Sequence, residues 1–139
     1  MNSIEYGSPI SLAAAKRVIA AAEAESQANG WQMVIVVLDS GGHLVALHRM
    51  DGVQLASLDV AQAKAQTSVR YRRDTRSFEQ RLVEGGVQMR LLSMPHLCPV
   101  EGGLPLLVDG KLVGAIGVSG ASSAQDGQVA AAGARALAG

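Results

Sequence analysis

The sequence predicts an α+β domain in which helices cover an antiparallel sheet. Two segments, 31–50 and 104–119, have the pattern of a β-hairpin, because each holds two aliphatic runs separated by a glycine-containing turn. Alanine-rich segments with apolar residues every three to four positions flank both hairpins and predict the covering helices. The length of 139 residues suits one core, so we expect residues 1–139 to form a single domain.

The first predicted helix begins near Ser8-Pro9 and ends at Asn29-Gly30. Serine caps a helix, proline suits its first turn, and glycine readily adopts the left-handed conformation that ends it. The run WQMVIVVLD then predicts a buried strand, and HLVALHRM predicts the return strand after the turn DSGG. One helix layer and one hairpin therefore account for the first 50 residues.

The second half repeats this order with more helices. A helix is predicted after Gly52, and a short one ends at Gly85-Gly86. Prolines and glycines punctuate residues 89–103, which predicts a loop with at most one short strand. The second hairpin turns at Asp109-Gly110, a pair typical of a type I′ turn, and residues 124–139 predict a last helix with small residues on nearly every side.

Composition excludes several classes of function. Twelve basic and twelve acidic residues give a net charge of zero, and aromatic residues make up 3%, so we expect no nucleic-acid or membrane partner. The longest apolar stretch, Met33 to Leu38, is far shorter than a membrane span. One cysteine, Cys98, cannot form an internal disulfide, and the first residues lack a secretory pattern. We therefore expect a cytoplasmic protein.

The histidines and the cysteine are candidate ligands only by their chemistry. His43 and His48 are five positions apart on one strand, so they point to opposite faces. No spacing of His and Cys matches a structural zinc site, and no metal site is predicted. The dipeptide Cys98-Pro99 resembles the short motif in which a thiolate binds haem iron, but two residues are a weak signal, and a small buried cysteine is the favoured interpretation. His96 lies two residues away, a spacing that rarely suits nucleophilic catalysis.

The glycine-rich turn after the second hairpin is a candidate anion site. The stretch GVSGASSAQDG leads from a strand into a helix N-terminus, where free backbone N–H groups favour a carboxylate or phosphate. The alternative is structural: its glycines permit close packing, and Asp126 caps the helix. Glu101, in the turn EGG, is a carboxylate at a flexible turn, and such a residue is more often solvated than functional.

Arg49 in RMDG raises a similar choice. If the strand ending at Met50 lies beside the glycine-rich strand, Arg49 reaches an anionic group at the sheet edge. The alternative is an ion pair of Arg49 with Asp51 or Glu101 that fixes a turn or a subunit contact. A basic stretch follows: residues 64–90 hold seven Lys or Arg and three acids.

Together the motifs VVLDSGGHLVALHRMDG, AQAKAQTS and EGGLPLLVDGKLVGAIGVSGASSAQD resemble the GlcG/HbpS-like family over nearly the whole chain. That family includes a haem-binding protein and the C-terminal domain of a corrinoid adenosyltransferase. The resemblance implies a five-stranded antiparallel sheet flanked by helices, similar to the profilin/roadblock arrangement. It also implies dimers, often octamers, and haem, corrinoid or iron binding in some members. It assigns no single activity.

These observations lead to three hypotheses. The first is a homo-oligomeric protein that binds haem or a corrinoid, in the setting of glycolate or B12-dependent diol and glycerol metabolism. The second is an enzyme acting on a small carboxylate or hydroxy-acid, in which Arg49 orients the anion and Glu101 or Asp126 is the general acid or base. The third is a scaffold subunit. The candidate binding residues are Arg49, Asp51, His48, His96, Cys98, Glu101, Gly102, Gly103, Ser119, Gly120, Gln125 and Asp126.

Overall fold

The computed structural model describes residues 4–138, which form four helices, one 3-10 helix and four strands. The predicted order of helix, hairpin, helices, hairpin and helix is observed. Along the chain the elements are α1 (Leu12–Ala28), β1 (Val34–Asp39), β2 (Leu44–Arg49), α2 (Ser57–Tyr71), α3 (Thr75–Glu84), η1 (Gly86–Ser93), β3 (Gly103–Val108), β4 (Lys111–Ser119) and α4 (Ser123–Ala138).

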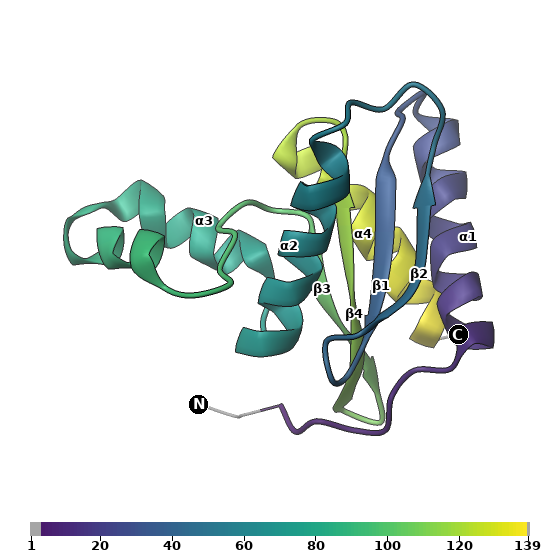
Figure 1. The fold of residues 1–139 in the computed structure, drawn as a ribbon, viewed down its shortest axis with the longest axis horizontal. Coiled ribbons are helices and arrows are strands. Elements are labelled where there is room, and N and C mark those ends of the chain that lie inside the picture. Colours follow the sequence, from purple (N-terminus) through teal and green to yellow (C-terminus); the bar gives the residue numbers. More distant parts are fainter. Residues whose placement is uncertain (1–3, 139) are drawn as a thin grey trace.

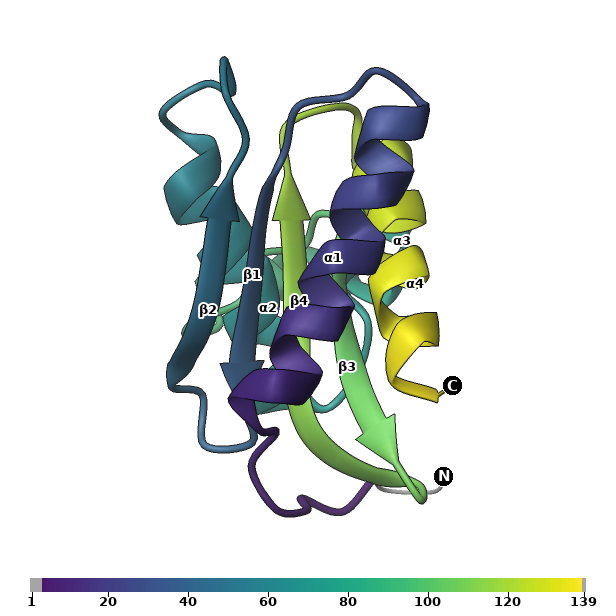
Figure 2. The ribbon, with the colours of Figure 1, turned by 90° about the vertical axis from the view of Figure 1, so that its right-hand side faces the viewer.

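The sheet is antiparallel throughout, with the strand order β2-β1-β4-β3. Helices α1 and α4 lie side by side on one face, and α2 lies on the other (Figures 1 and 2). Successive residues of β1 alternate between the two layers, so Ile35 and Val37 face α1, whereas Val34 and Val36 face α2. Because both faces are covered, all four side chains are fully buried.

Helix α2 packs very close to the central strand β4. A Cβ atom at Gly117 would overlap the carbonyl oxygen of Ala61 and lie 2.7 Å from the nitrogen of Ala65. Only glycine on the strand and alanine on the helix permit this approach. The small residues of AQAKAQTS on α2 and of GAIGVSG on β4 therefore form the contact between this helix and the sheet.

The expectation of five strands is wrong, because the sheet in residues 4–138 has four. The segment from Gly86 to Ser93 forms a 3-10 helix, and Pro95 and Pro99 follow it, so no strand forms between α3 and β3. From residue 4 to the start of α1, the chain adds one isolated bridge to the described strand pairing, between Tyr6 and Leu112.

Helix α1 begins later than predicted. Its N-cap is Ser11, whose Oγ accepts a hydrogen bond from the nitrogen of Ala14 at 3.1 Å. Before it, Ile10 donates a backbone hydrogen bond to the oxygen of Val113 on β4, which holds this segment extended. Ser8 and Pro9 therefore precede the helix, because tertiary pairing overrides the local signal.

Helices α3 and η1 project away from the layered body, and we refer to residues 75–93 as the α3–η1 arm (Figure 1). The second hairpin has the predicted turn, since Asp109 and Gly110 have φ angles of 52° and 77°, as a type I′ turn requires. No helix in residues 4–138 is long and apolar enough to cross a membrane.

Candidate functional site

Three of the sequence motifs meet at one end of the sheet. Arg49, the last residue of β2, pairs with Val34 of β1, and Val34 pairs on its other side with Ser119 of β4. On the far side of β4, the oxygen of Gly102 accepts a hydrogen bond from the nitrogen of Val118. The turns RMDG, GVSG and VEGG thus lie at the same level of the sheet, at the end of β2, the end of β4 and the start of β3, with β1 between β2 and β4.

A buried ion pair lies beneath these turns. Lys64 of α2 donates to Asp126 Oδ2 of α4 at 2.8 Å and to the oxygen of Val118 at 2.9 Å. Lys64 is 1% exposed and Asp126 is 3% exposed. Because a buried ammonium without a counter-charge is very costly, each residue requires the other, and the pair ties α2 to the α4 N-terminus.

Asp126 also organises the glycine-rich turn. Its Oδ1 accepts a hydrogen bond from the nitrogen of Ala121 at 3.0 Å. Burial raises the pKa of Asp126 above its ordinary value, and the hydrogen bond and charge of Lys64 oppose that shift. Gln125 and Ser122 exchange side-chain to backbone hydrogen bonds at 3.2 Å, which is a capping box. Asp126 and Gln125 thus make contacts typical of residues that cap the N-terminus of a helix.

The EGG turn covers the Lys64–Asp126 pair. A Cβ atom at Gly102 would lie 2.8 Å from Lys64 Nζ, and one at Gly103 would lie 2.9 Å from Ser68 Oγ. Gly103 donates its N–H to Thr75 Oγ1 at 2.9 Å. Both glycines are needed so that the backbone can close over the lysine.

Glu101 is the first residue of the EGG turn and lies at its edge. Its backbone N–H donates to Glu79 Oε1 at 3.0 Å, and its carboxylate lies 3.9 Å from Arg76 Nε. Burial raises the pKa of Glu101 above its ordinary value, and the Arg76 guanidinium partly offsets this. The structure therefore places Glu101 near Asp126 but on the solvent side of it.

Arg49 and Glu101 do not form a common site. Strand β1 separates β2 from β4, so the two residues lie at opposite edges of the sheet, about 14 Å apart by three inter-strand spacings. Neither the Arg49–Asp51 nor the Arg49–Glu101 ion pair forms in residues 4–138. Arg49 and Asp51 instead line an open hollow of 360 Å³ beside α1, and His48 contacts the carboxylate of Glu23 there.

His96 and Cys98 share a hollow of 250 Å³ against α2. Both line it, together with Met94, Leu97, Ala63 and Gln66. His96 has a φ of 56°, which is uncommon for a residue other than glycine. Thr67 of α2 holds the loop in this conformation: its Oγ1 accepts from the nitrogen of Cys98 at 2.8 Å and lies 3.2 Å from the oxygen of His96.

Cys98 is half-buried in this hollow, and burial raises the pKa of its thiol. The charge of Lys64 opposes the shift without cancelling it. The side chain is therefore a neutral thiol near pH 7. Within residues 4–138 no group of three or more His, Cys, Asp or Glu is arranged to hold a metal ion on its own.

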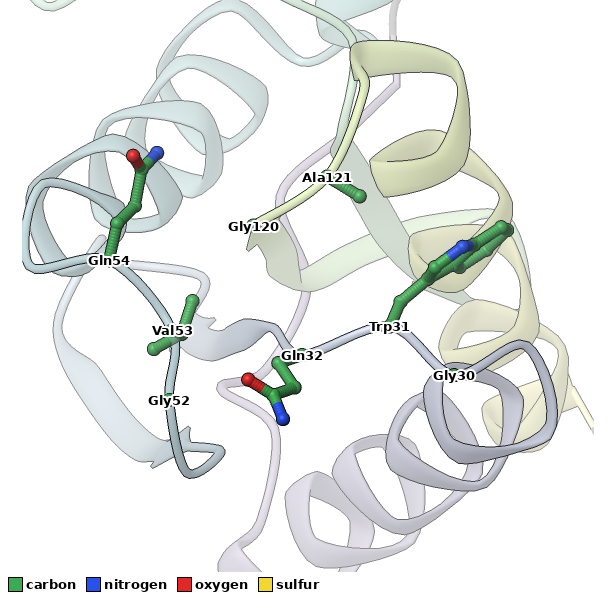
Figure 3. A pocket seen from close by; sticks show the side chains of 8 residues that line it. All are labelled: Gly30, Trp31, Gln32, Gly52, Val53, Gln54, Gly120 and Ala121. Carbon is green, nitrogen blue, oxygen red and sulfur yellow. The ribbon is translucent and has the colours of Figure 1, made fainter.

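A third hollow lies at the strand ends, between the segment before α2 and the β4–α4 turn (Figure 3). It has a volume of 380 Å³, and Gln54 and Trp31 lie on opposite sides of it (Figure 3). Of the predicted site residues only Gly120 lines it, since the hydroxyl of Ser119 is buried and donates to Ser57 Oγ at 3.2 Å. This cleft offers amides and an indole but no ionisable group.

Two residues at these sites were not among the predicted ones, Lys64 and Thr67. A signal for Lys64 exists, because Ala61, Lys64 and Ala65 share the apolar face of one helix, and a lysine in that position requires a buried partner. Nothing in the sequence indicates Thr67, whose partner loop begins almost 30 residues later.

The fold and these motifs define a family. Residues 10–135 match the model of the family described as haem degrading protein HbpS-like, and the chain belongs to that family. It is 43% identical over 105 residues to protein GlcG of Escherichia coli K12, covering 76% of this chain and 77% of that protein.

Two solved structures support the assignment. Protein ORFY of Klebsiella pneumoniae is 27% identical, with a TM-score of 0.89 over 99% of this chain and 97% of its own. PduOC, solved as a complex with heme, is 25% identical, with a TM-score of 0.83 over 92% of this chain and 94% of its own.

Proposed function

We propose that this chain is a tetrapyrrole-binding protein, with haem as the principal ligand, and that the hollow of His96 and Cys98 holds the iron. One observation carries the proposal: an imidazole and a thiol line one hollow, together with the apolar side chains of Met94, Leu97 and Ala63 and the amide of Gln66. Membership of the HbpS-like family, and the heme complex of the related PduOC, support haem over other ligands.

The donor set suits the group. Protein ligands of haem iron include histidine, cysteine and methionine side chains, and His96, Cys98 and Met94 all line the hollow. The cobalt of a corrinoid also accepts an imidazole, so the same residues serve the alternative ligand. When bound, the metal supplies a redox-active centre, and this chain supplies its ligands and an apolar surface that limits access of water.

A second copy of the chain would complete the site. The hollow of 250 Å³ is smaller than the roughly 300–1,000 Å³ of pockets that enclose a drug-sized ligand. Met94, which lines it, and Leu92, two positions earlier in the chain, are exposed apolar residues that suit burial against another subunit. We therefore include the expected homo-oligomer, from dimer to octamer, in this proposal. Iron binding, the link to glycolate or B12-dependent metabolism and the cytoplasmic location stay predictions.

The test is a titration of the purified protein with hemin and, in parallel, with cob(II)alamin, followed by absorbance. We expect a saturable spectral shift with hemin, which His96→Ala or Cys98→Ala weakens by about tenfold or changes in form, as the loss of one ligand bond would. His43→Ala is the matched control, because His43 is an exposed imidazole outside the hollow.

The outcomes separate the ligands and the sites. A shift with cob(II)alamin alone would assign the site to a corrinoid. A shift that only His48→Ala removes would place the metal at the β2 edge. An unchanged, non-saturating response in every variant would refute tetrapyrrole binding.

A further inference from the structure

The α3–η1 arm encloses a hollow of 260 Å³ that no predicted site residue lines. Three guanidinium groups line it, those of Arg73, Arg81 and Arg90, together with Tyr71, Phe78 and Gln88. These arginines belong to the basic stretch 64–90, which the proposed function does not explain.

Phe78 holds two of the arginines in place. Its ring is 2% exposed, and the Cζ atoms of Arg73 and Arg81 lie 5.4 and 5.9 Å from its centroid. Tyr71 packs edge-on against the same ring, with centroids 5.5 Å apart. A guanidinium stacked on an aromatic face keeps its N–H donors at the rim of the ring, so stacking orients the group for a ligand. Arg73 Nε donates to the oxygen of Tyr71 at 3.3 Å, which leaves its two terminal amino groups for a ligand.

The charge of the hollow is not neutralised by the protein. No carboxylate lines it, and within residues 4–138 no acidic group lies within 4.0 Å of these three arginines. Two of the three acids of this region have other contacts: Asp74 caps α3 by accepting from the nitrogen of Ser77, and Glu79 accepts from the nitrogen of Glu101. The third, Glu84, is exposed and does not line the hollow. Three like charges converge on one small concave surface, where their fields add.

We propose that this hollow is an anion-binding site that takes a carboxylate or phosphate group. Guanidinium groups bind both of these anions through paired N–H donors. The volume suits one small anionic group rather than a whole drug-sized ligand. Tyr71 and Phe78 give the hollow an apolar side that suits an anion attached to a flat or apolar body.

Two sources supply such a group. One is a free anion from solution. The other is a side-chain carboxylate of a tetrapyrrole, because Met94 lines both this hollow and the hollow of His96 and Cys98. The proposal of an anion site does not depend on the proposed function, and the second source links the two.

The first arm of the experiment measures binding of inorganic pyrophosphate to the whole chain by calorimetry at low salt. We expect saturable binding that weakens as salt is added, and a loss of about tenfold for Arg81→Gln or Arg90→Gln, since each removes a charge-assisted contact. Arg17→Gln on α1 is the control, because Arg17 is equally exposed and lies outside the hollow.

The second arm compares hemin with hemin dimethyl ester, in which both carboxylates are blocked. If Arg81→Gln and Arg90→Gln weaken hemin but not the ester, the anion belongs to the tetrapyrrole. If they weaken pyrophosphate alone, the site binds a free anion. If the double variant Arg81→Gln, Arg90→Gln binds pyrophosphate and hemin as tightly as Arg17→Gln does, the proposal is wrong. If His96→Ala loses hemin binding but keeps pyrophosphate binding, the iron site and the anion site are separate.

Discussion

The layered body and the α3–η1 arm are built by different rules. In the body, the strands β1 and β4 are buried along nearly their whole length between α1, α4 and α2. In the arm, only Thr75, Phe78 and Leu91 are buried, whereas Val83 and Val87 are 85% and 67% exposed. The body is therefore specified by burial, and the arm by a few contacts around one aromatic ring.

This difference between the body and the arm indicates which part of the molecule is available to bind a ligand. The body uses the buried Lys64–Asp126 pair to fasten helices. The arm presents Arg81 and Arg90, which have no carboxylate within 4.0 Å in the described residues, and several exposed apolar side chains. Both proposed sites involve the arm or the loop that follows it. The four predictions below test this contrast, beginning with the largest effect.

The ion pair of the body is expected to give the largest loss. Asp126→Ala should lower the free energy of unfolding by about 3–5 kcal/mol, because it leaves the ammonium of Lys64 buried without a counter-charge. Urea unfolding measures this. The control is Asp59→Ala on the exposed start of α2, which should cost less than about 1 kcal/mol. Equal losses in the two variants would mean that the pair contributes nothing specific.

The same substitution in the two regions sharpens the contrast. Val36→Ala in β1 should cost about 2 kcal/mol, because the side chain is fully buried and its loss leaves a cavity. Val83→Ala in the arm should change stability by less than about 0.5 kcal/mol, since it is 85% exposed. Thermal unfolding of both variants gives the comparison, and a larger cost at Val83 would show that a partner covers the arm.

Phe78→Leu tests whether the arm opens independently. We expect a cost of about 1 kcal/mol, because leucine keeps part of the packing but loses the stacking with Arg73 and Arg81. Hydrogen exchange should accelerate in residues 75–93 and stay unchanged in β1 and β4. Faster exchange throughout the sheet would show instead that arm and body unfold as one unit.

The smallest effect is one of reactivity. Burial raises the pKa of the Cys98 thiol, so at any pH below that pKa less thiolate is present in the folded chain than in the unfolded one. Alkylation with iodoacetamide should therefore be slower in the native protein and should rise about tenfold per pH unit up to pH 8. Mass spectrometry follows it, since Cys98 is the one cysteine. A rate that levels off below pH 8 would contradict the direction of the shift.

The sequence predicts the body well because its signals are local. Asp109 and Gly110 dictate a turn without reference to the rest of the chain, and the alternation of β1 follows from burial on two faces. The prediction of a fifth strand was wrong because it came from the family resemblance, whereas the prolines of residues 89–103 already indicated a loop.

The candidate site was less predictable because its contacts are long-range. His96 and Cys98 are close in sequence and remain together, whereas the partner of Lys64 is 62 residues away. The separation of Arg49 from Glu101 depends on strand order, which a hairpin pattern does not determine. Residue types thus indicated candidate chemistry, and topology decided which groups meet.

The strand order also has a consequence for the speed of folding. Each hairpin can form locally, but the sheet is complete only when β1 pairs with β4, which joins Val34 to Ser119, 85 positions apart. Closing so long a loop costs entropy before the strand contacts repay it, and chains dominated by such pairings fold in roughly milliseconds to seconds. Formation of the β1–β4 pair is therefore the step that we expect to limit the folding rate.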